Sequence, residues 1–489
     1  CRFEDASDLV GRRANDKVQT LHERFGPNGH YAVIGPAGEN YRSVRFAAVV
    51  LSTENQLKSG DPKPRFCGRG GMGGIMGSKN LLAIVADTKD RSAATAANFK
   101  DLNKEVARGP GSARFRDEAT EGLGGTWANY EPLEQFHMVP QNNFRPTGDG
   151  KPALMFRDAL EDDFVIKAES CYRCGINCHK NLYERKADGS RGAFRAKFDY
   201  EPLNLLSTNA GVHDPDEVWP LVALIDHLGM DSISCGTTIN YVLDYNARHP
   251  DAPVFNGATF GDADKIRELI EQVGTGQLPE LGQGSKRLSE QLGETAYAMH
   301  CKGLELPAYV PDINPGYPWA IAGGHMSMGT YMLVAMEGDT SLDYWVRAIT
   351  ERGLLVVRDD LLGVCKFAGL NAEMAAQCLG DELGLHRRRY RPVAREFHGE
   401  LGFALRGRTQ GRGVAKHLGQ RHFRLRDRDA ANFLLSGDRA ASLQDGGQDA
   451  ARKLGRRFDP HPHDRLEHFR CALVIGFSPG GFRGFLERD

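Results

Sequence analysis

The chain has 489 residues, of which 40% are hydrophobic and 26% are charged, and its formal net charge is −2. This composition is typical of a large globular protein with about two to four domains, and it lacks both the basic excess of a nucleic-acid-binding protein and the low hydrophobicity of a disordered chain. Apolar stretches such as Arg45–Leu51 and Leu81–Ala86 are far shorter than the roughly 20 residues of a membrane-spanning helix. We therefore expect neither a nucleic-acid partner nor a membrane span.

The use of cysteine bears on the cellular compartment. Ten cysteines in a chain of this length are too few for a disulfide scaffold, and three of them crowd between Cys171 and Cys178, as metal ligands do. This pattern indicates a reducing compartment and predicts a cytoplasmic protein. The chain begins at Cys1 without a signal segment, so we expect its native N-terminus, and any targeting signal, to lie outside this sequence.

Residues 30–87 have the pattern of β-strands separated by glycine-rich segments. Apolar and β-branched runs occur at Tyr31–Ile34, Val44–Leu51 and Leu81–Val85. The string Ile34-Gly-Pro-Ala-Gly-Glu-Asn40 follows the first run. We predict a sheet-containing domain over residues 1–90.

A second glycine-rich string has the sequence Arg65-Phe-Cys-Gly-Arg-Gly-Gly-Met-Gly-Gly-Ile-Met-Gly-Ser-Lys-Asn80. Glycine permits positive φ and a close approach of the backbone, and exposed N–H groups beside Arg65 or Arg69 can bind the anionic oxygens of a phosphate. The string also contains G-x-G-x-x-G, which occurs in dinucleotide-binding folds. We disfavour that interpretation because no strand is predicted immediately before the glycines, and a strand is predicted at 81–86, where the nucleotide-binding helix should continue.

Helices are predicted to dominate beyond residue 90. In Asp214–Leu228 the apolar residues recur at helical spacing; Asp214-Pro215 begins this helix and Gly229 ends it. A further helical segment is predicted at Asp343–Val357. We place one helical domain at residues 91–301 and a second at 302–489.

The cysteine triplet Cys171-x2-Cys174-x3-Cys178 lies in a short loop that can wrap thiolates around one centre. His179 could complete a structural zinc site with the three cysteines. A cubane iron–sulfur cluster needs four thiolates and can take the last from far away in the sequence, for which Cys365 is the best candidate. A buried structural thiol is the alternative for Cys365.

Two segments, Asp226-His-Leu-Gly-Met-Asp231 and Asp360-Leu-Leu-Gly-Val-Cys365, fit the same pattern of an aspartate, a glycine and a final aspartate or cysteine. Each follows an amphipathic helix. Either one alone would be interpreted as an ordinary helix C-terminus with a capping glycine. Their pairing is what two similar ligands would require.

The segment 386–489 is atypical, with twenty arginines against two lysines and little periodicity before Cys471–Phe477. One interpretation is a basic, solvated helical tail. The other is a shifted reading frame of GC-rich DNA, which tends to encode an arginine-rich, lysine-poor amino-acid sequence. No site is predicted in this segment.

Taken together, the two glycine strings, the cysteine triplet and the paired aspartate motifs resemble the aldehyde:ferredoxin oxidoreductase family. The resemblance implies an α+β protein, in which residues 1–90 are the remnant of an N-terminal β-rich pterin-binding domain whose first hundred or so residues lie outside this sequence. Two mostly α-helical domains follow, the first carrying the cysteine triplet. It also implies a tungsten or molybdenum bis-pterin beside one 4Fe-4S cluster, with a magnesium ion as a further candidate cofactor.

The resemblance carries roles onto individual residues. Glu201, in Asp199-Tyr-Glu201, is expected to transfer protons beside the metal with a raised pKa, and His325, in Gly323-Gly-His325, to polarise a carbonyl oxygen. Expected cluster ligands are Cys171, Cys174, Cys178 and Cys365. Expected pterin-binding residues are Arg65, Gly68, Arg69, Asp226, Met230, Asp231, Asp360, Val364 and Cys365.

The implied function is oxidation of a small aldehyde to a carboxylic acid, with electrons passing through the cluster to ferredoxin or a ferredoxin-like subunit, and a homodimer is a candidate assembly. Two alternatives stay open. An aryl-CoA (benzoyl-CoA) reductase of the same superfamily would use a protein thiolate at the metal, for which Cys235 is a candidate, although a buried structural cysteine is the more common role. A non-enzymatic iron–sulfur or zinc protein is the second.

Overall fold

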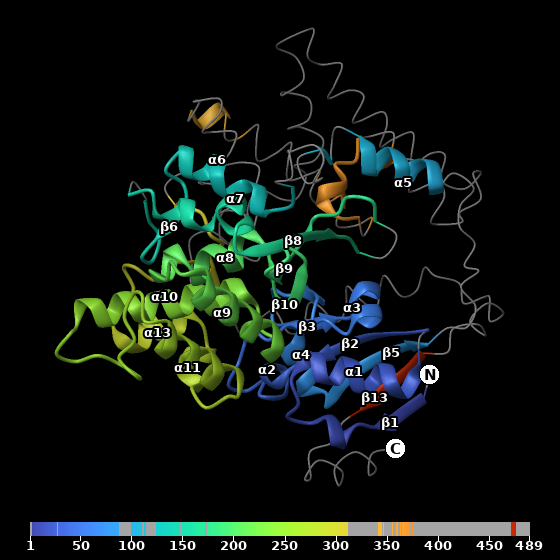
Figure 1. Cartoon of the computed structure of the whole chain (residues 1–489). Coiled ribbons are helices and arrows are strands. Elements are labelled where there is room, and N and C mark those ends of the chain that lie inside the picture. Colours follow the sequence, from blue (N-terminus) through green and yellow to red (C-terminus); the bar gives the residue numbers. More distant parts are fainter. Residues whose placement is uncertain are drawn as a thin grey trace, which may run out of the picture. The chain divides into compact units, whose positions relative to one another are not determined.

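A computed structural model describes the chain (Figure 1). Contacts divide it into two compact units, residues 1–374 with 470–489 and residues 375–469, and every element below belongs to the first. His325, Asp360 and most of the predicted helix at 343–357 lie outside the described residues. The residues described are 2–26, 28–87, 99–109, 112–113, 124–146, 149–171, 174–311, 341–344 and 471–475, with short stretches between 346 and 375.

A six-stranded sheet forms the N-terminal part, as the alternation of strands and glycine-rich segments predicted. Its strands follow the order β1-β13-β5-β2-β3-β4, and every neighbouring pair is antiparallel except β1 with β13. The predicted run 44–51 forms a strand only at its end. The strands are β1 (Arg2–Asp5), β2 (Gly29–Ile34), β3 (Val49–Leu51), β4 (Arg65–Cys67), β5 (Leu81–Asp87) and β13 (Cys471–Ile475).

Helix α1 (Ala14–Phe25) packs on this sheet, because its apolar side chains Val18 and Leu21 share a buried cluster with Val33 of β2 and Val85 of β5. Helix α3 (Glu54–Ser59) begins with a capping box between Thr53 and Gln56. Two further short helices are α2 (Pro36–Glu39) and α4 (Met72–Ser78).

The glycine string folds as β4, a loop and α4, so a strand does precede the glycines, contrary to the sequence prediction. The dinucleotide fold is still excluded for a different reason. Strand β4 is antiparallel to β3, and β5, which follows α4, is antiparallel to β2. A dinucleotide-binding unit requires parallel strands joined by a helical crossover.

Three antiparallel strands in the order β10-β9-β8 lie within the region predicted to be mostly helical. They are β8 (Phe164–Glu169), β9 (His179–Arg185) and β10 (Arg191–Phe198). Sequence patterning missed this sheet, because its residues combine charged and apolar side chains without the long β-branched runs of the first sheet.

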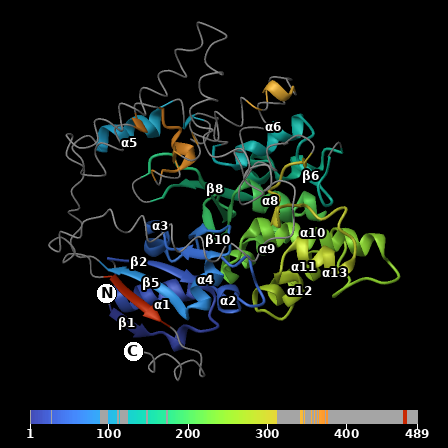
Figure 2. The ribbon, with the colours of Figure 1, turned by 180° about the vertical axis from the view of Figure 1, so that it is seen from behind.

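Helices form much of the rest of this region (Figures 1 and 2). The predicted helix is confirmed as α9 (Pro215–Leu228): the Asp214 side chain accepts a hydrogen bond from the Asp216 N–H at 2.9 Å, and Gly229 ends the helix with φ 73°. The other helices are α5 (Phe99–Arg108), α6 (Tyr130–Gln135), α7 (Arg157–Glu161), α8 (Tyr200–Leu206), α10 (Ser232–Arg248), α11 (Ala263–Gly274), α12 (Pro279–Gly282) and α13 (Ser285–Leu292).

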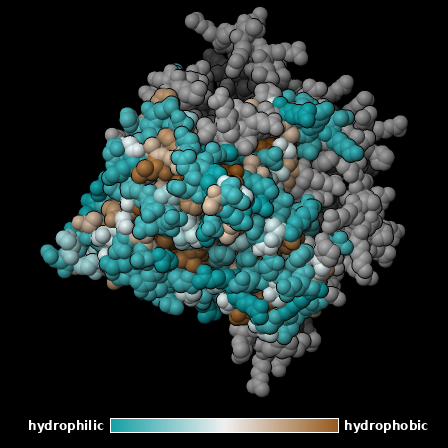
Figure 3. All heavy atoms as spheres, in the orientation of Figure 1, coloured by the Kyte–Doolittle hydropathy of each residue, from teal (hydrophilic) through white to brown (hydrophobic). Residues whose placement is uncertain are grey.

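Short elements connect these helices, and a large apolar core extends from residue 37 to residue 309. Within the described part of the chain no helix is long and apolar enough to cross a bilayer. The face seen in Figure 3 is largely hydrophilic, with small separate apolar patches. The short elements are β6 (Pro140–Gln141), β7 (Arg145–Pro146), β11 (His300–Cys301), β12 (Leu304–Glu305) and 3₁₀ turns at Ser7–Leu9, Trp127–Asn129, Lys151–Met155, Thr208–Ala210 and Lys366–Ala368.

Glycines in α4 are explained by close backbone packing. A Cβ added to Gly77 would lie 1.8 Å from the Gly38 carbonyl oxygen of α2, and one added to Gly73 would lie 2.2 Å from the Ala48 carbonyl oxygen. At Gly74 the nearest atom, Tyr41 Cβ, would be 3.6 Å away, which is an ordinary contact. Helix α4 can therefore approach its neighbours only where side chains are absent.

Replacing Gly77 by alanine is expected to destabilise the protein by about 1–3 kcal/mol or more, because the new methyl group must push α4 away from α2. Gly74→Ala is the matched control in the same helix. It should be neutral or stabilising by up to about 1 kcal/mol, since alanine is the better helix former. Thermal unfolding of both variants checks this, and equal midpoints would contradict the packing argument.

Candidate iron–sulfur and pterin site

The cysteine triplet lies in the loop of a β-hairpin. Strand β8 ends at Glu169 and β9 begins at His179, and these two residues are paired directly across the hairpin. Within the loop the Cys174 N–H donates to the Cys171 carbonyl at 3.0 Å. The hairpin thereby holds the ends of the loop together and leaves Cys171 exposed and Cys178 half-buried.

Cys365 approaches this loop from a distant part of the sequence. The pKa values of Cys171 and Cys178 are each raised in part by Cys365, and the Arg65 guanidinium interacts with all three thiols. Arg65, on β4, is also 3.7 Å from the Asp199 carboxylate. Cys171, Cys178 and Cys365, which are far apart or separate in sequence, thus all lie within electrostatic range of one cation.

Burial favours the protonated form of the Cys178 thiol. It raises the pKa of Cys178 to about 12, and the nearby Arg65 only partly offsets this. His179 Nε2 lies 3.3 Å from Cys171 Sγ, and burial lowers the pKa of His179 to about 3, so the ring is neutral. Loading of a metal centre here must release protons from the cysteines.

The zinc alternative requires side chains that converge on a single ion. Among the residues that the structure describes, no three His, Cys, Asp or Glu side chains are arranged to hold one metal ion. Residues 172 and 173 of the loop are not described.

The start of the glycine string has the features of an anion-binding loop. Gly70 has φ 89° and nothing within 4 Å of an added Cβ, and the nearest atom to one on Gly68 would be 3.9 Å away. Between them, Arg69 donates to the Glu305 carbonyl at 2.6 Å and lies 3.2 Å from Asp231. Its Nη1 is buried without a hydrogen-bond partner, which favours an anionic ligand not present in the structure.

The first aspartate motif packs directly on the N-terminal domain. The Asp231 N–H donates to the Phe46 carbonyl at 2.9 Å, and the Ala48 N–H donates to the Gly229 carbonyl at 2.8 Å. Met230, between them, forms an isolated antiparallel bridge with Ala47. The Asp231 side chain is buried as the N-cap of α10, where it accepts a hydrogen bond from the Ile233 N–H at 3.1 Å.

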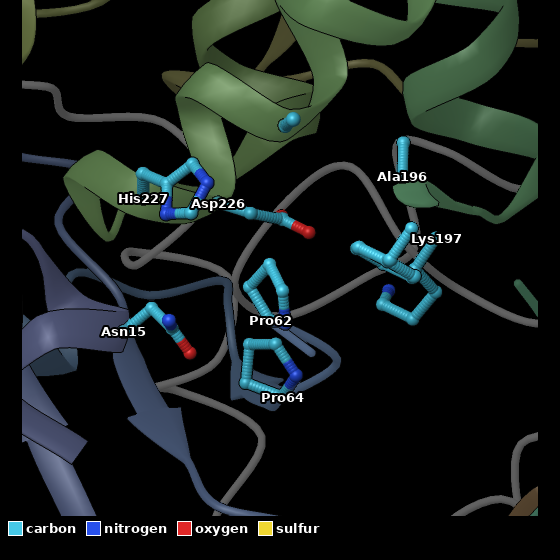
Figure 4. A pocket seen from close by; sticks show the side chains of 9 residues that line it. Asn15, Pro62, Pro64, Ala196, Lys197, Asp226 and His227 are labelled. Atoms are coloured by element: carbon cyan, nitrogen blue, oxygen red, sulfur yellow. The ribbon is translucent and has the colours of Figure 1, made fainter. Parts of the chain in front are cut away.

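Asp226 faces a pocket between α9, β10 and the segment before β4 (Figure 4). Its carboxylate points toward the space between Pro62, Pro64 and Lys197. Burial raises the pKa of Asp226 to about 6, against the opposing effect of Lys197. The pocket is lined by Asn15, Pro62, Pro64, Phe194, Ala196, Lys197, Ala223, Asp226 and His227.

Glu201 is buried in the first turn of α8, and burial raises its pKa to about 7. The Tyr309 hydroxyl donates to Glu201 Oε1 at 2.9 Å and thereby lowers this pKa. Asp199, two residues earlier, behaves oppositely: Lys197, at 2.7 Å, and Arg65 hold its pKa well below the usual range despite its burial. The two carboxyl groups of Asp199-Tyr-Glu201 therefore carry different protonation states near neutral pH.

His325 and Asp360 are outside the described residues, so their predicted roles stay predictions. Val364 is described, and its N–H donates to the Asp359 carbonyl at 3.0 Å. Sequence reasoning missed both Tyr309 and Lys197. No spacing rule links either residue to the carboxylate that it contacts.

Comparison with known proteins identifies the family. Residues 1–88 match the family model for the aldehyde ferredoxin oxidoreductase N-terminal domain, and residues 102–389 match the model for domains 2 and 3. The chain belongs to the aldehyde ferredoxin oxidoreductase family. The family expected from the sequence motifs is therefore confirmed, together with an α+β architecture that begins with a sheet-containing domain.

Several of the similar proteins are tungsten-containing aldehyde ferredoxin oxidoreductases. The tungsten-containing aldehyde ferredoxin oxidoreductase of Pyrococcus furiosus is 28% identical over 64% of this chain and 50% of its own length. That of Pyrococcus abyssi is 29% identical over 78% and 64%. The aliphatic sulfonate oxidoreductase WOR-like subunit of Pyrococcus furiosus is 26% identical over 60% and 47%. The chain thus spans about half to two thirds of the length of these relatives.

A solved structure, the active-site complex BamBC of benzoyl coenzyme A reductase with 1,5-dienoyl-CoA, is similar with a TM-score of 0.48 and 18% identity. The match covers 62% of this chain and 46% of that one. A likeness of this degree does not bear on the reaction.

The buried Glu201 makes stability depend on pH in a defined direction. Because its pKa in the folded state is about 7, against an ordinary value of 4.5, folding is favoured by protonation below pH 4.5. That contribution, on the order of 3 kcal/mol, is lost as the pH rises to about 7. Relative to Glu201→Gln, the cofactor-free wild type should lose thermal stability over this range.

Exposed Glu217 in the first turn of α9 supplies the control. Glu217→Gln should keep the pH dependence of the wild type, whereas Glu201→Gln flattens it. Parallel stability curves for wild type and Glu201→Gln would show that Glu201 titrates as an ordinary carboxyl group.

Proposed function

We propose that the protein is a tungsten- or molybdenum-pterin oxidoreductase that oxidises an aldehyde to a carboxylic acid. Electrons would leave through a 4Fe-4S cluster to ferredoxin or a ferredoxin-like subunit. The observation that carries the proposal is that Cys365 and two thiols of the cysteine hairpin all interact electrostatically with the Arg65 guanidinium, which lies 3.7 Å from the Asp199 carboxylate. Membership of a family whose named relatives contain tungsten and use ferredoxin supports it.

The residues fit the implied cofactors. Cys171, Cys174, Cys178 and Cys365 would hold the cluster, since thiolates are the usual ligands of such clusters and the last can be remote in sequence. The buried, unpaired Nη1 of Arg69 and the open backbone at 68–70 would bind the anionic part of a pterin.

Carboxylates of the first aspartate motif, which lies beside the anion-binding loop, suit the pterin ring. Asp226 and Asp231 would accept hydrogen bonds from its N–H groups, and the Cys365 segment, with Asp360 and Val364, would do the same for the second pterin. When bound, the metal held by the pterins supplies the acceptor for the two electrons of the aldehyde.

Glu201 is the group suited to proton transfer. A carboxyl group with a pKa of about 7 can both accept and release a proton near neutral pH. Tyr309 holds Oε1 at 2.9 Å and so fixes the orientation of the carboxyl group. We propose that Glu201 takes a proton released during aldehyde oxidation and that His325 orients the carbonyl group of the substrate.

Cys235 bears on the aryl-CoA reductase alternative, which requires a thiolate at the metal. It is 1% exposed within the apolar core, and burial raises the pKa of its thiol far above the usual range. These properties are those of a structural cysteine. We therefore favour aldehyde oxidation.

Anaerobically purified protein is expected to contain tungsten or molybdenum with about four iron atoms per chain and to reduce a viologen dye with aldehydes. A panel of aldehydes is compared with benzoyl-CoA in the same assay. Zinc alone would support the structural-metal interpretation and refute the proposal. If the protein contained all of its cofactors and reacted only with benzoyl-CoA, the aryl-CoA reductase alternative would be correct and aldehyde oxidation would be refuted.

Cys365→Ser is expected to remove a cluster ligand and abolish the electron paramagnetic resonance signal of the reduced 4Fe-4S cluster. Cys67→Ser is the matched control, because Cys67 is also an exposed free cysteine and lies on β4 beside Arg65. It should keep the iron content and the signal of the wild type. An unchanged signal in Cys365→Ser would place the fourth ligand elsewhere.

A further inference from the structure

A buried ion pair joins the segment before β4 to the cysteine hairpin. Lys63 Nζ lies 3.1 Å from both carboxylate oxygens of Glu169, and their side chains are 4% and 9% exposed. Lys63 also donates to the Tyr183 hydroxyl at 3.1 Å. Burial lowers the pKa of Lys63, but the bonds to Tyr183 and Glu169 raise it above its ordinary value, so the lysine is charged.

The Glu169 carboxylate lies at the base of the hairpin loop. It is the last residue of β8, two residues before Cys171, and pairs with His179, which follows Cys178. The Asn181 amide of β9 donates to Glu169 Oε2 at 2.9 Å. The position of Glu169 therefore affects both ends of the cysteine loop.

Lys63 is also close in sequence to Arg65, the cation that interacts with the thiols. Lys63 precedes Arg65 by two residues, and only Pro64 separates them, so little backbone freedom lies between the ammonium and the guanidinium group. The Tyr183 hydroxyl accepts a hydrogen bond from Lys63 and donates one to Asp61 at 3.1 Å. The segment 61–63 is thus bonded to β9 at two residues.

Buried ion pairs contribute little net stability, because desolvation offsets their attraction. They do fix geometry, since removal of one partner leaves a buried charge that is only partly compensated: Lys63 would keep Asp61 at 3.4 Å, and Glu169 would keep Lys167 at 3.5 Å. The pair between Lys63 and Glu169 is thus suited to hold β4 in one position against the hairpin.

We propose that the ion pair between Lys63 and Glu169 is a positioning device that holds the Arg65 guanidinium against the cysteine loop and thereby sets the reduction potential of the cluster. The inference rests on the proposed iron–sulfur cluster. A fixed cation beside the thiolates favours the reduced, more negative cluster, and net charge around a cluster is one of the determinants of its potential.

The test uses Lys63→Met and Glu169→Met, which remove opposite charges from the same contact. If the two residues acted only through their own charges, Lys63→Met would lower the midpoint potential and Glu169→Met would raise it. If they act by positioning Arg65, both variants release the guanidinium and both lower the potential. Redox titration followed by electron paramagnetic resonance measures the shift, and the signal should also broaden in both.

Lys17→Met controls for lost stability. Lys17 is a second buried lysine, bonded to Glu39 and to the Ile34 carbonyl at 2.7 Å, and it lies on α1 in the N-terminal domain. Its removal should lower the melting temperature while leaving the cluster potential unchanged. Lys63→Arg, which keeps the charge, should restore most of the wild-type potential.

The outcomes separate the inference from the proposed function. A shift to lower potential in both methionine variants, or loss of iron in both while Lys17→Met keeps it, supports anchoring by this pair. Opposite shifts, or potentials equal to that of the wild type, overturn it. Wild-type protein that binds no iron overturns the proposed function itself, and the inference with it.

Discussion

The site depends on one close backbone contact between the N-terminal domain and the helical region. Gly35, after β2, and Gly229, after α9, touch through their backbones: a Cβ on Gly35 would lie 2.2 Å from the Leu228 carbonyl oxygen. This approach lets residues 46–48 form strand-like hydrogen bonds with residues 229–231. Because Asp231 sits in that bridge and also contacts Arg69, the contact places the first aspartate motif beside the anion-binding loop.

The two carboxyl groups of Asp199-Tyr-Glu201 lie in different electrostatic environments. Cations from β4 and β10, namely Arg65 and Lys197, surround Asp199 and keep it ionised. Glu201 points elsewhere into the interior, where burial outweighs every nearby charge and raises its pKa to about 7. One short string therefore supplies both a permanent anion that orients cations and a carboxyl group able to exchange a proton, because Asp199 is the extended N-cap residue before α8 and Glu201 lies in the first turn of the helix.

The glycines of the string at 65–80 occur for two different reasons. The sequence predicted an anion-binding loop, and the backbone at Gly68 and Gly70 is indeed open, whereas Gly73 and Gly77 are small because they pack against other backbone segments. A run of glycines cannot by itself distinguish these two causes, since both require the absence of Cβ. The three-stranded sheet that carries the cysteine loop was likewise missed, because it depends on cross-strand pairs rather than on local propensity.

The sequence alone determined the family, the helix at 215–228 with both of its caps, and the strands β2 and β5 with the end of the run at 44–51, because each of these depends on residues close together in the chain. Only the tertiary structure decided that β8 and β9 form the stem of the cysteine loop, that Lys63 forms an ion pair with Glu169 of that stem, and that Tyr309 donates a hydrogen bond to Glu201. The last two contacts join residues more than about 100 positions apart in the chain. Side-chain types fix what such groups can do, but the packing of distant segments fixes which groups meet.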